Sequence, residues 1–274
     1  MTWEPRLPLT AAEKTVDFQA HENHILTRRT VVERLAAAPT RRLAVSVVDL
    51  GVSNIHTRAV EEALTRSLAA TARFGFTQAR REIRQLRAGQ DVTARAVPDA
   101  GRYAALATAG LAAVLDLISH RARRTAQAVA ASTGTEAITN TEPDKILRAA
   151  AAAAAGLKVL HLHVLELVGE TLNLGRTAGV LSLRRPPVHA MRSEQLDKTT
   201  CDPCSRYHGE IAEVGTGAFY ALLPPQGCLG GGRCRGIMVF ADRIADVRAP
   251  EPAEEDLARI RRDERDRRRR RQAA

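Results

Sequence analysis

The sequence predicts a mainly α-helical protein, in which long alanine-rich helices precede a small cysteine-rich α+β module and a charged C-terminal tail. Hydrophobic residues make up 45% of the 274 residues but aromatic residues only 3%, which favours an aliphatic core between packed helices. Apolar residues recur at helical spacing through the first two thirds of the chain. After residue 184 alanine becomes rarer, and all four cysteines follow.

The first predicted helix covers residues 10–35. Thr10 and Glu13 at its start form the T-x-x-E pattern of a capping box, in which each residue bonds the backbone of the other. Pro39 is expected to end the helical pattern, because proline lacks the N–H that a helix interior requires. A short apolar segment then follows.

Three more helices are predicted, over residues 57–87, 99–132 and 141–183. The first of them has an apolar stripe at helical spacing, formed by Val60, Leu64, Leu68, Thr71 and Phe74. The last begins at a threonine cap followed by proline in the first turn, and Gly156 is its one weak point.

A domain boundary is predicted at about residues 184–188, because the sequence RRPP at 184–187 cannot continue a helix. The expected organisation is a helical domain over 1–183, a cysteine-rich module over 188–240 and a partly disordered charged tail over 241–274. Within the module, VHAMR and RGIMVF have the composition of strands.

The formal net charge of +10 suits a polyanionic partner, and five consecutive arginines stand at residues 267–271. We therefore consider contact between this basic tail and double-stranded DNA, although a solvated tail accounts for the same pattern.

No secretory signal is recognisable, and no apolar run reaches the length of a membrane span. Lys158, His161, His163 and Glu166 interrupt the most apolar stretch. We expect a protein without membrane contact, made in the cytoplasm, where thiols stay reduced.

The four cysteines form a C-x2-C pair, Cys201 and Cys204, and a C-x5-C pair, Cys228 and Cys234. Four thiolates from two such turns can hold a structural zinc ion in a tetrahedral site. His208 is an alternative ligand, since it follows the first pair after three residues. The residues leave three states open: bound zinc, free thiols, and thiols oxidised after assembly.

The run LDKTTCDPCSRYHGE…LLPPQGCLGGGRCRGIMVF resembles the C-terminal signature of the phage Mu F-like minor capsid, or head morphogenesis, protein family. The signature residues are Asp197, Thr199, Thr200, Cys201, Cys204, Gly209, Pro224, Pro225, Cys228, Cys234 and Arg235. A second element of the resemblance lies just upstream, in VGETLNLGRTAG. It consists of Glu170, Asn173, Gly175 and Arg176.

The resemblance implies a virion structural protein without catalysis. Such a protein is assembled in the host cytoplasm, resides in the phage head, has portal and capsid proteins as partners and assists procapsid assembly near the portal vertex. The four cysteines would maintain the module, and Glu170, Asn173 and Arg176 would hold the preceding helix against it.

Two other interpretations remain open at this point. One is a DNA-binding protein with a zinc ribbon, although long alanine-rich helices suit assembly better than groove reading. The other is a zinc-assisted nuclease, in which His208 and Glu210 would act beside the metal.

Overall fold

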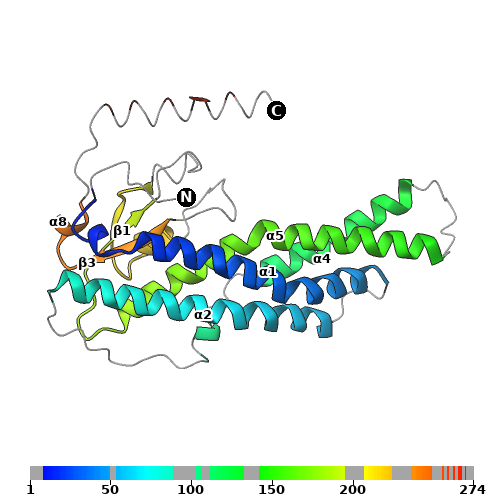
Figure 1. The fold of residues 1–274 in the computed structure, drawn as a ribbon, viewed down its shortest axis with the longest axis horizontal. Helices are drawn as coiled ribbons and strands as arrows, with labels where there is room; N and C mark the ends of the chain where they lie inside the picture. The colour runs from blue at the N-terminus through cyan, green and yellow to red at the C-terminus, as the bar shows by residue number, and fades with distance from the viewer. Residues whose placement is uncertain are drawn as a thin grey trace. The chain divides into compact units, whose positions relative to one another are not determined.

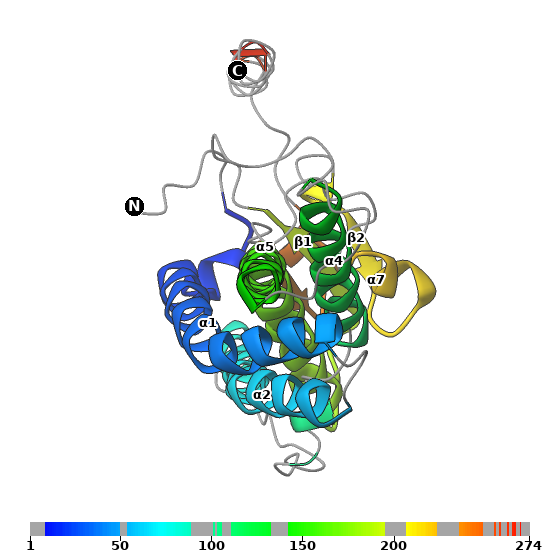
Figure 2. The same cartoon turned by 90° about the vertical axis from the view of Figure 1, so that its right-hand side faces the viewer.

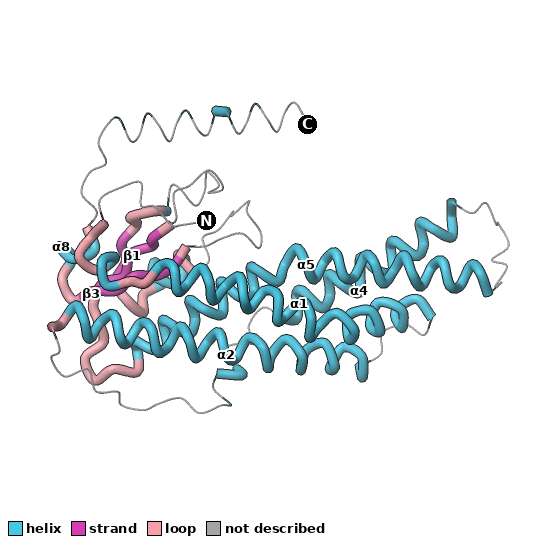
Figure 3. The backbone as a smooth tube through the Cα atoms, viewed as in Figure 1, coloured by secondary structure: helices cyan, strands magenta, loops and turns pink. Residues whose placement is uncertain are grey.

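The computed structural model describes residues 9–49, 54–88, 111–132, 142–194, 207–223 and 236–248, and a few single positions elsewhere. The described chain is mainly helical, as predicted, with one small sheet (Figures 1 and 3). Its long helices are α1 (Phe18–Asp49), α2 (Asn54–Leu86), α4 (Leu111–Ser132) and α5 (Glu142–Leu181).

The sheet is antiparallel and has the strand order β2-β1-β3. Its strands are β1 (His189–Ser193), β2 (Ile211–Glu213) and β3 (Ile237–Ala241). Strands β1 and β3 confirm the strand character of VHAMR and RGIMVF, whereas β2 is too short to show a period in the sequence. Two short helices, α7 (Gly217–Ala221) and α8 (Ile244–Val247), accompany the strands, and Figure 2 shows α7 beside β2.

The predicted capping box forms, but it closes a different element. Thr10 N–H donates to Glu13 Oε2 over 2.9 Å, and Glu13 N–H donates to Thr10 Oγ1 over 3.1 Å. These bonds close the turn at residues 10–13 that leads into the single 3₁₀ turn η1 (Glu13–Thr15), and η1 ends because Val16 is extended. Asp17 then caps α1 itself, since its Oδ1 accepts from the N–H of Ala20 at 2.9 Å.

The expectation that Pro39 ends the first helix is wrong, because α1 continues through it to Asp49. A proline inside a helix removes one hydrogen bond, and packing on either side can offset this cost. Val32 and Ala36 before the proline and Leu43 and Ala44 after it are buried, so the apolar face of the helix is continuous.

Helices α2 and α5 confirm the predicted helices at 57–87 and 141–183. Gly156 is not a weak point of α5 but a packing position. A Cβ atom at Gly156 would lie 3.0 Å from Ala44 Cβ, so glycine allows α1 and α5 to approach closely here.

The chain divides by its contacts into two compact units. Unit 1 combines Met1–His24, Ala72–Val97 and Leu172–Ala274, and unit 2 combines Ile25–Thr71 and Pro98–Thr171. This division differs from a boundary at residues 184–188, because the strands share their unit with parts of three long helices. The composition of the sequence shows where the helices end. It does not show which helical turns pack against the sheet.

Each unit has its own core. In unit 1, Ile83 and Val180 of the helices pack with Phe219 and Phe240 of the module. The ring centroids of these two phenylalanines are 6.3 Å apart. In unit 2 the cluster is made of alanines, namely Ala44, Ala122, Ala126 and Ala152. Phe219 and Phe240 therefore supply aromatic packing where short strands replace regular helix packing, whereas Phe74 and Phe76 pack within the helices.

One described helix, the segment Lys145–Leu181 of α5, is long and apolar enough to cross a membrane by length and composition. Of its most apolar window, 44% is buried within the protein, and a core helix passes the same criterion. The absence of membrane contact stays a prediction.

Candidate functional site

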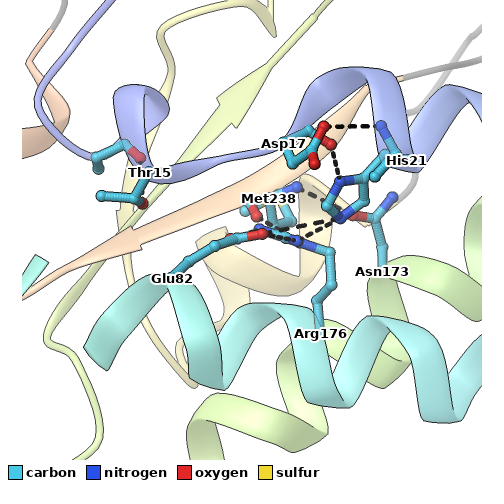
Figure 4. Close-up of polar contacts among 9 residues, drawn as sticks. Thr15, Asp17, His21, Glu82, Asn173, Arg176 and Met238 are labelled. Carbon is cyan, nitrogen blue, oxygen red and sulfur yellow. Dashed lines mark hydrogen bonds and ion pairs between the residues drawn. The ribbon is translucent and has the colours of Figure 1, made fainter. Parts of the chain in front are cut away.

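The main candidate site is a buried polar cluster in unit 1, formed by His21 of α1, Glu82 of α2, and Asn173 and Arg176 of α5. We call it the Arg176 cluster (Figure 4). The exposed fractions are 0% for Arg176, 2% for His21, 5% for Glu82 and 6% for Asn173. Polar groups this deeply buried require partners, so the bonds of each member decide what the cluster does.

Arg176 is the centre of the cluster, and each nitrogen of its guanidinium group is bonded. Its Nη1 and Nη2 donate to Glu82 Oε1 at 2.9 Å and Oε2 at 2.5 Å, which is a bidentate ion pair. Its Nε donates to the carbonyl oxygen of Met238 on β3 at 2.9 Å. The buried charge is thus neutralised and fully hydrogen-bonded, the condition under which a buried arginine is tolerated.

Asn173 lies one helical turn before Arg176 and binds the same strand. Its Nδ2 donates to Gly236 O at 3.0 Å, and its Oδ1 accepts from Met238 N–H at 2.9 Å. One side-chain amide thus offers β3 a donor and an acceptor, as the peptide group of a neighbouring strand would. Because the other edge of β3 pairs with β1, α5 takes the place of a further strand.

The hydrogen bonds of His21 define its protonation state. Its Nδ1 donates to the carbonyl oxygen of Asp17 at 2.8 Å, and its Nε2 accepts from Arg176 Nη1 at 2.8 Å. Only the neutral tautomer with the proton on Nδ1 makes both bonds. Burial, with the nearby positive charge of Arg176 as the second cause, lowers the pKa of His21 to about 3. Glu82 Oε1 lies 3.9 Å from Nε2 but is already paired with Arg176, so burial prevails.

Two glycines allow α2 and α5 to approach closely enough to build this cluster. A Cβ atom at Gly175 would collide with the backbone carbonyl of Ala72 on α2, and one at Gly75 would collide with Leu172 O on α5. The adjacent backbones bring Arg176 within reach of Glu82. Gly175 therefore has a packing role that is separate from the hydrogen bonds of its neighbours.

A second buried ion pair lies on β1. Arg192 Nε donates to Glu194 Oε1 at 2.7 Å, and both side chains are almost fully buried. A Cβ atom at Gly236, just before β3, would collide with both of these charged groups, so a larger residue there would displace the ion pair. Next to this pair, Ser193 Oγ donates to Glu13 Oε1 at 2.6 Å and attaches the N-terminal turn to the sheet.

The sequence-predicted ligands are placed only in part. The four cysteines at 201, 204, 228 and 234 lie outside the described residues. His208 is described, and its Nδ1 accepts from the N–H of Glu194 at 3.0 Å, so only Nε2 could bind a metal. Burial lowers the pKa of His208, which favours the neutral ring that a metal needs. No group of three or more potential ligands occurs among the described residues, and the zinc site stays a prediction.

The structure brings Asn173 and Arg176 together against β3, whereas Gly175 packs against Ala72 of α2. Glu170 lies half-buried one turn before Asn173. Sequence reasoning missed the two partners that complete the cluster. His21 stands in the polar sequence HENH, which is typical of an exposed helix face, but the structure buries it. Glu82 stands in the run RREIRQLR, where a lone carboxylate resembles part of a charged face.

Comparison of the chain with family models found no match, and comparison with curated proteins and with solved structures found none either. The functional argument therefore depends on the residues and on the geometry of the Arg176 cluster.

Proposed function

We propose that this protein is a minor capsid, or head morphogenesis, protein of the phage Mu F-like type. It acts as a structural component at or near the portal vertex and assists procapsid assembly. It is made in the host cytoplasm and resides in the phage head, where portal and capsid proteins are its partners. The observation that carries the proposal is the direct bonding of Asn173 and Arg176 to β3, the strand that follows the last cysteine.

This bonding supports the proposal because it links the two segments that carry the family resemblance. The upstream element contributes Asn173 and Arg176, and the other partner is the strand that ends the cysteine-containing signature. The two segments are far apart in sequence, since Arg176 and Met238 are separated by 62 residues. Two elements of one family signature are expected to contact each other if they serve one structural role, whereas two unrelated motifs need not.

Burial favours a scaffold over a catalytic centre. A general base or an arginine that stabilises a transition state must reach its substrate. Arg176 is fully buried, and His21 is buried and bonded through both ring nitrogens. These groups hold α1, α2, α5 and β3 together, so we propose no enzymatic activity.

The cysteines and the basic tail belong to the same proposal. Cys201, Cys204, Cys228 and Cys234 would hold one structural zinc, with His208 as the alternative ligand. The arginine-rich end of the chain would contact packaged double-stranded DNA.

The test is the protein content of purified phage particles. Particles from a lysate of the phage that encodes the chain are separated on a density gradient, and the chain is quantified by mass spectrometry against the portal protein. We expect it in the head fraction, in a number comparable to the portal subunits or smaller. Its absence from heads and procapsids would refute the proposal.

A double variant of the Arg176 cluster tests whether assembly depends on how firmly the module is held. Arg176→Met together with Glu82→Gln removes the ion pair but keeps the side-chain volumes, and the double variant should enter particles less efficiently because the module is held less firmly. DNA cleavage by the purified wild-type protein in the presence of zinc or magnesium would instead favour the nuclease interpretation.

A further inference from the structure

A group of exposed arginines lies at the C-terminal end of α2, outside the Arg176 cluster. It consists of Arg81 and Arg84 on α2 and of Arg184 and Arg185 just after α5, and we call it the arginine corner. We infer that the arginine corner binds the phosphate backbone of double-stranded DNA. The inference rests on the proposed function in one respect: it takes packaged phage DNA to be the natural ligand.

The fold holds the two parts of the arginine corner together. Arg87, just after the end of α2, donates from Nη2 to the carbonyl oxygen of Arg185 at 2.9 Å. Leu183 and Pro187 are buried on either side of the exposed pair Arg184 and Arg185. The arginines are therefore presented from anchored backbone, which lowers the entropy lost when they bind a partner.

The nearby carboxylates are already engaged with other arginines. Asp242 accepts from Arg87 at 2.8 and 2.6 Å, and Glu82 is paired with Arg176. Among the described residues, no carboxylate forms an ion pair with any member of the arginine corner. The positive charge of the corner is thus not balanced within the described part of the chain, and a polyanion can use it.

Stabilisation of helix ends does not account for so many arginines. A helix C-terminus carries about half a negative charge, and one cation in the last turn offsets it. Arg84 is the basic residue in the last turn of α2 and can supply that cation, but Arg81, Arg184 and Arg185 lie outside the last turn of any long helix. Arg80 is only half-buried, but its Nε is enclosed and has no hydrogen-bond partner in the described chain, so we do not count it in the arginine corner. Its guanidinium lies 5.5 Å from the Phe76 ring centroid, one turn before Arg84.

The exposed stripe of α2 in unit 1 favours nucleic acid over an acidic protein as the partner. Its members are Arg73, Thr77, Arg81, Arg84 and Gln85. The stripe contains no carboxylate and no large apolar side chain, whereas protein interfaces need a desolvated apolar or aromatic centre. From Arg73 to Arg84 it spans about 16 Å along the helix axis, which is the length of about five base pairs.

The test is a titration of fluorescently labelled duplex DNA of mixed sequence with the full-length protein, followed by anisotropy over a range of salt concentrations. One variant carries R81Q and R84Q, and a second carries R184Q and R185Q. Each should bind about tenfold more weakly, and the slope of log K against log salt should fall by about two, since each phosphate contact contributes about 0.9.

Two further variants make the result specific. R41Q with R42Q removes the same charge from exposed positions of α1 in unit 2 and should leave the slope nearly unchanged. Replacement of the five arginines at 267–271 by glutamine measures the contribution of the tail, and the effect of the corner variants should persist in that background. Equal slopes for the corner variants and the R41Q/R42Q control would overturn the inference, as would complete loss of binding in the tail variant alone.

The outcome is independent of the particle experiment. A chain that is found in phage heads but shows no corner-dependent DNA binding would refute this inference and leave the proposed function intact. Corner-dependent binding by a chain that is absent from heads would refute the proposed function alone. Unchanged DNA binding together with loss of portal binding in the corner variants would refute the inference in favour of a protein partner.

Discussion

Acid should destabilise unit 1 through His21, and His21→Gln should remove that effect. Burial of the ring, and then the nearby positive charge of Arg176, lowers the pKa of His21 from 6.5 to about 3, so the folded protein resists protonation of the ring. The unfolded chain binds the proton at its ordinary pKa. The contribution of neutral His21 to the free energy of unfolding is therefore fully present above about pH 6.5. It is lost as the pH falls from 6.5 towards 3, because the unfolded state then binds more protons than the folded state.

The magnitude follows from the size of the shift. Each pH unit below 6.5 costs about 1.4 kcal/mol, so a fall from about pH 7.5 to about pH 5 should remove about 2 kcal/mol of unfolding free energy through His21. Glutamine can still accept from Arg176 through Oε1 but does not titrate in this range. The free energy of unfolding is measured by urea denaturation, followed by far-UV circular dichroism, for both proteins at both pH values.

The comparison isolates His21, because the carboxylates and His208 titrate in both proteins. Wild type should lose about 2 kcal/mol more than His21→Gln on acidification. The same loss in both proteins would refute the assigned tautomer and the role of Arg176 as the donor to the ring.

Three other perturbations test the remaining parts of the fold. Asn173→Ala should cost about 2 to 3 kcal/mol of stability and speed hydrogen exchange at the Met238 amide, since it leaves two buried backbone groups unbonded; unchanged exchange would contradict the strand-like role of this side chain. Gly175→Ala should cost about 1 to 3 kcal/mol in thermal or urea unfolding, because the methyl group meets the Ala72 carbonyl, and more than Gly156→Ala, which meets a side-chain methyl group. Elemental analysis should find about one zinc per chain in wild type and much less in Cys201→Ser, and equal zinc in both would remove that cysteine from the site.

Local patterns predicted the local parts of the fold. Thr10 and Glu13 are three residues apart, so their reciprocal bonds could be expected from the sequence, although not that they would close a single turn. The apolar stripe of α2 likewise reports on one helix face. The path of α1 through Pro39 could not be predicted, because the compensating burial comes from elements distant in sequence.

The candidate site could be predicted only from one side. The family resemblance pointed to Asn173 and Arg176, but the partners Glu82 and His21 lie 94 and 155 residues from Arg176. A single sequence holds no signal that pairs residues at such distances. In the sequence both partners resemble surface residues, because Glu82 stands among arginines and His21 stands beside Glu22. Only the fold shows that they are buried.

The Arg176 cluster also constrains the order in which the chain can fold. Every residue of unit 2 precedes residue 172, so that unit can form while the ribosome is still adding the rest. His21 and Glu82, by contrast, are synthesised long before Arg176, and the strand that completes the cluster emerges only with Met238. Until Met238 has been added, the side chains of His21 and Glu82 remain exposed to water. Unit 1 should therefore be the last part of the newly made chain to become resistant to proteases, and truncation before β3 should leave it unfinished.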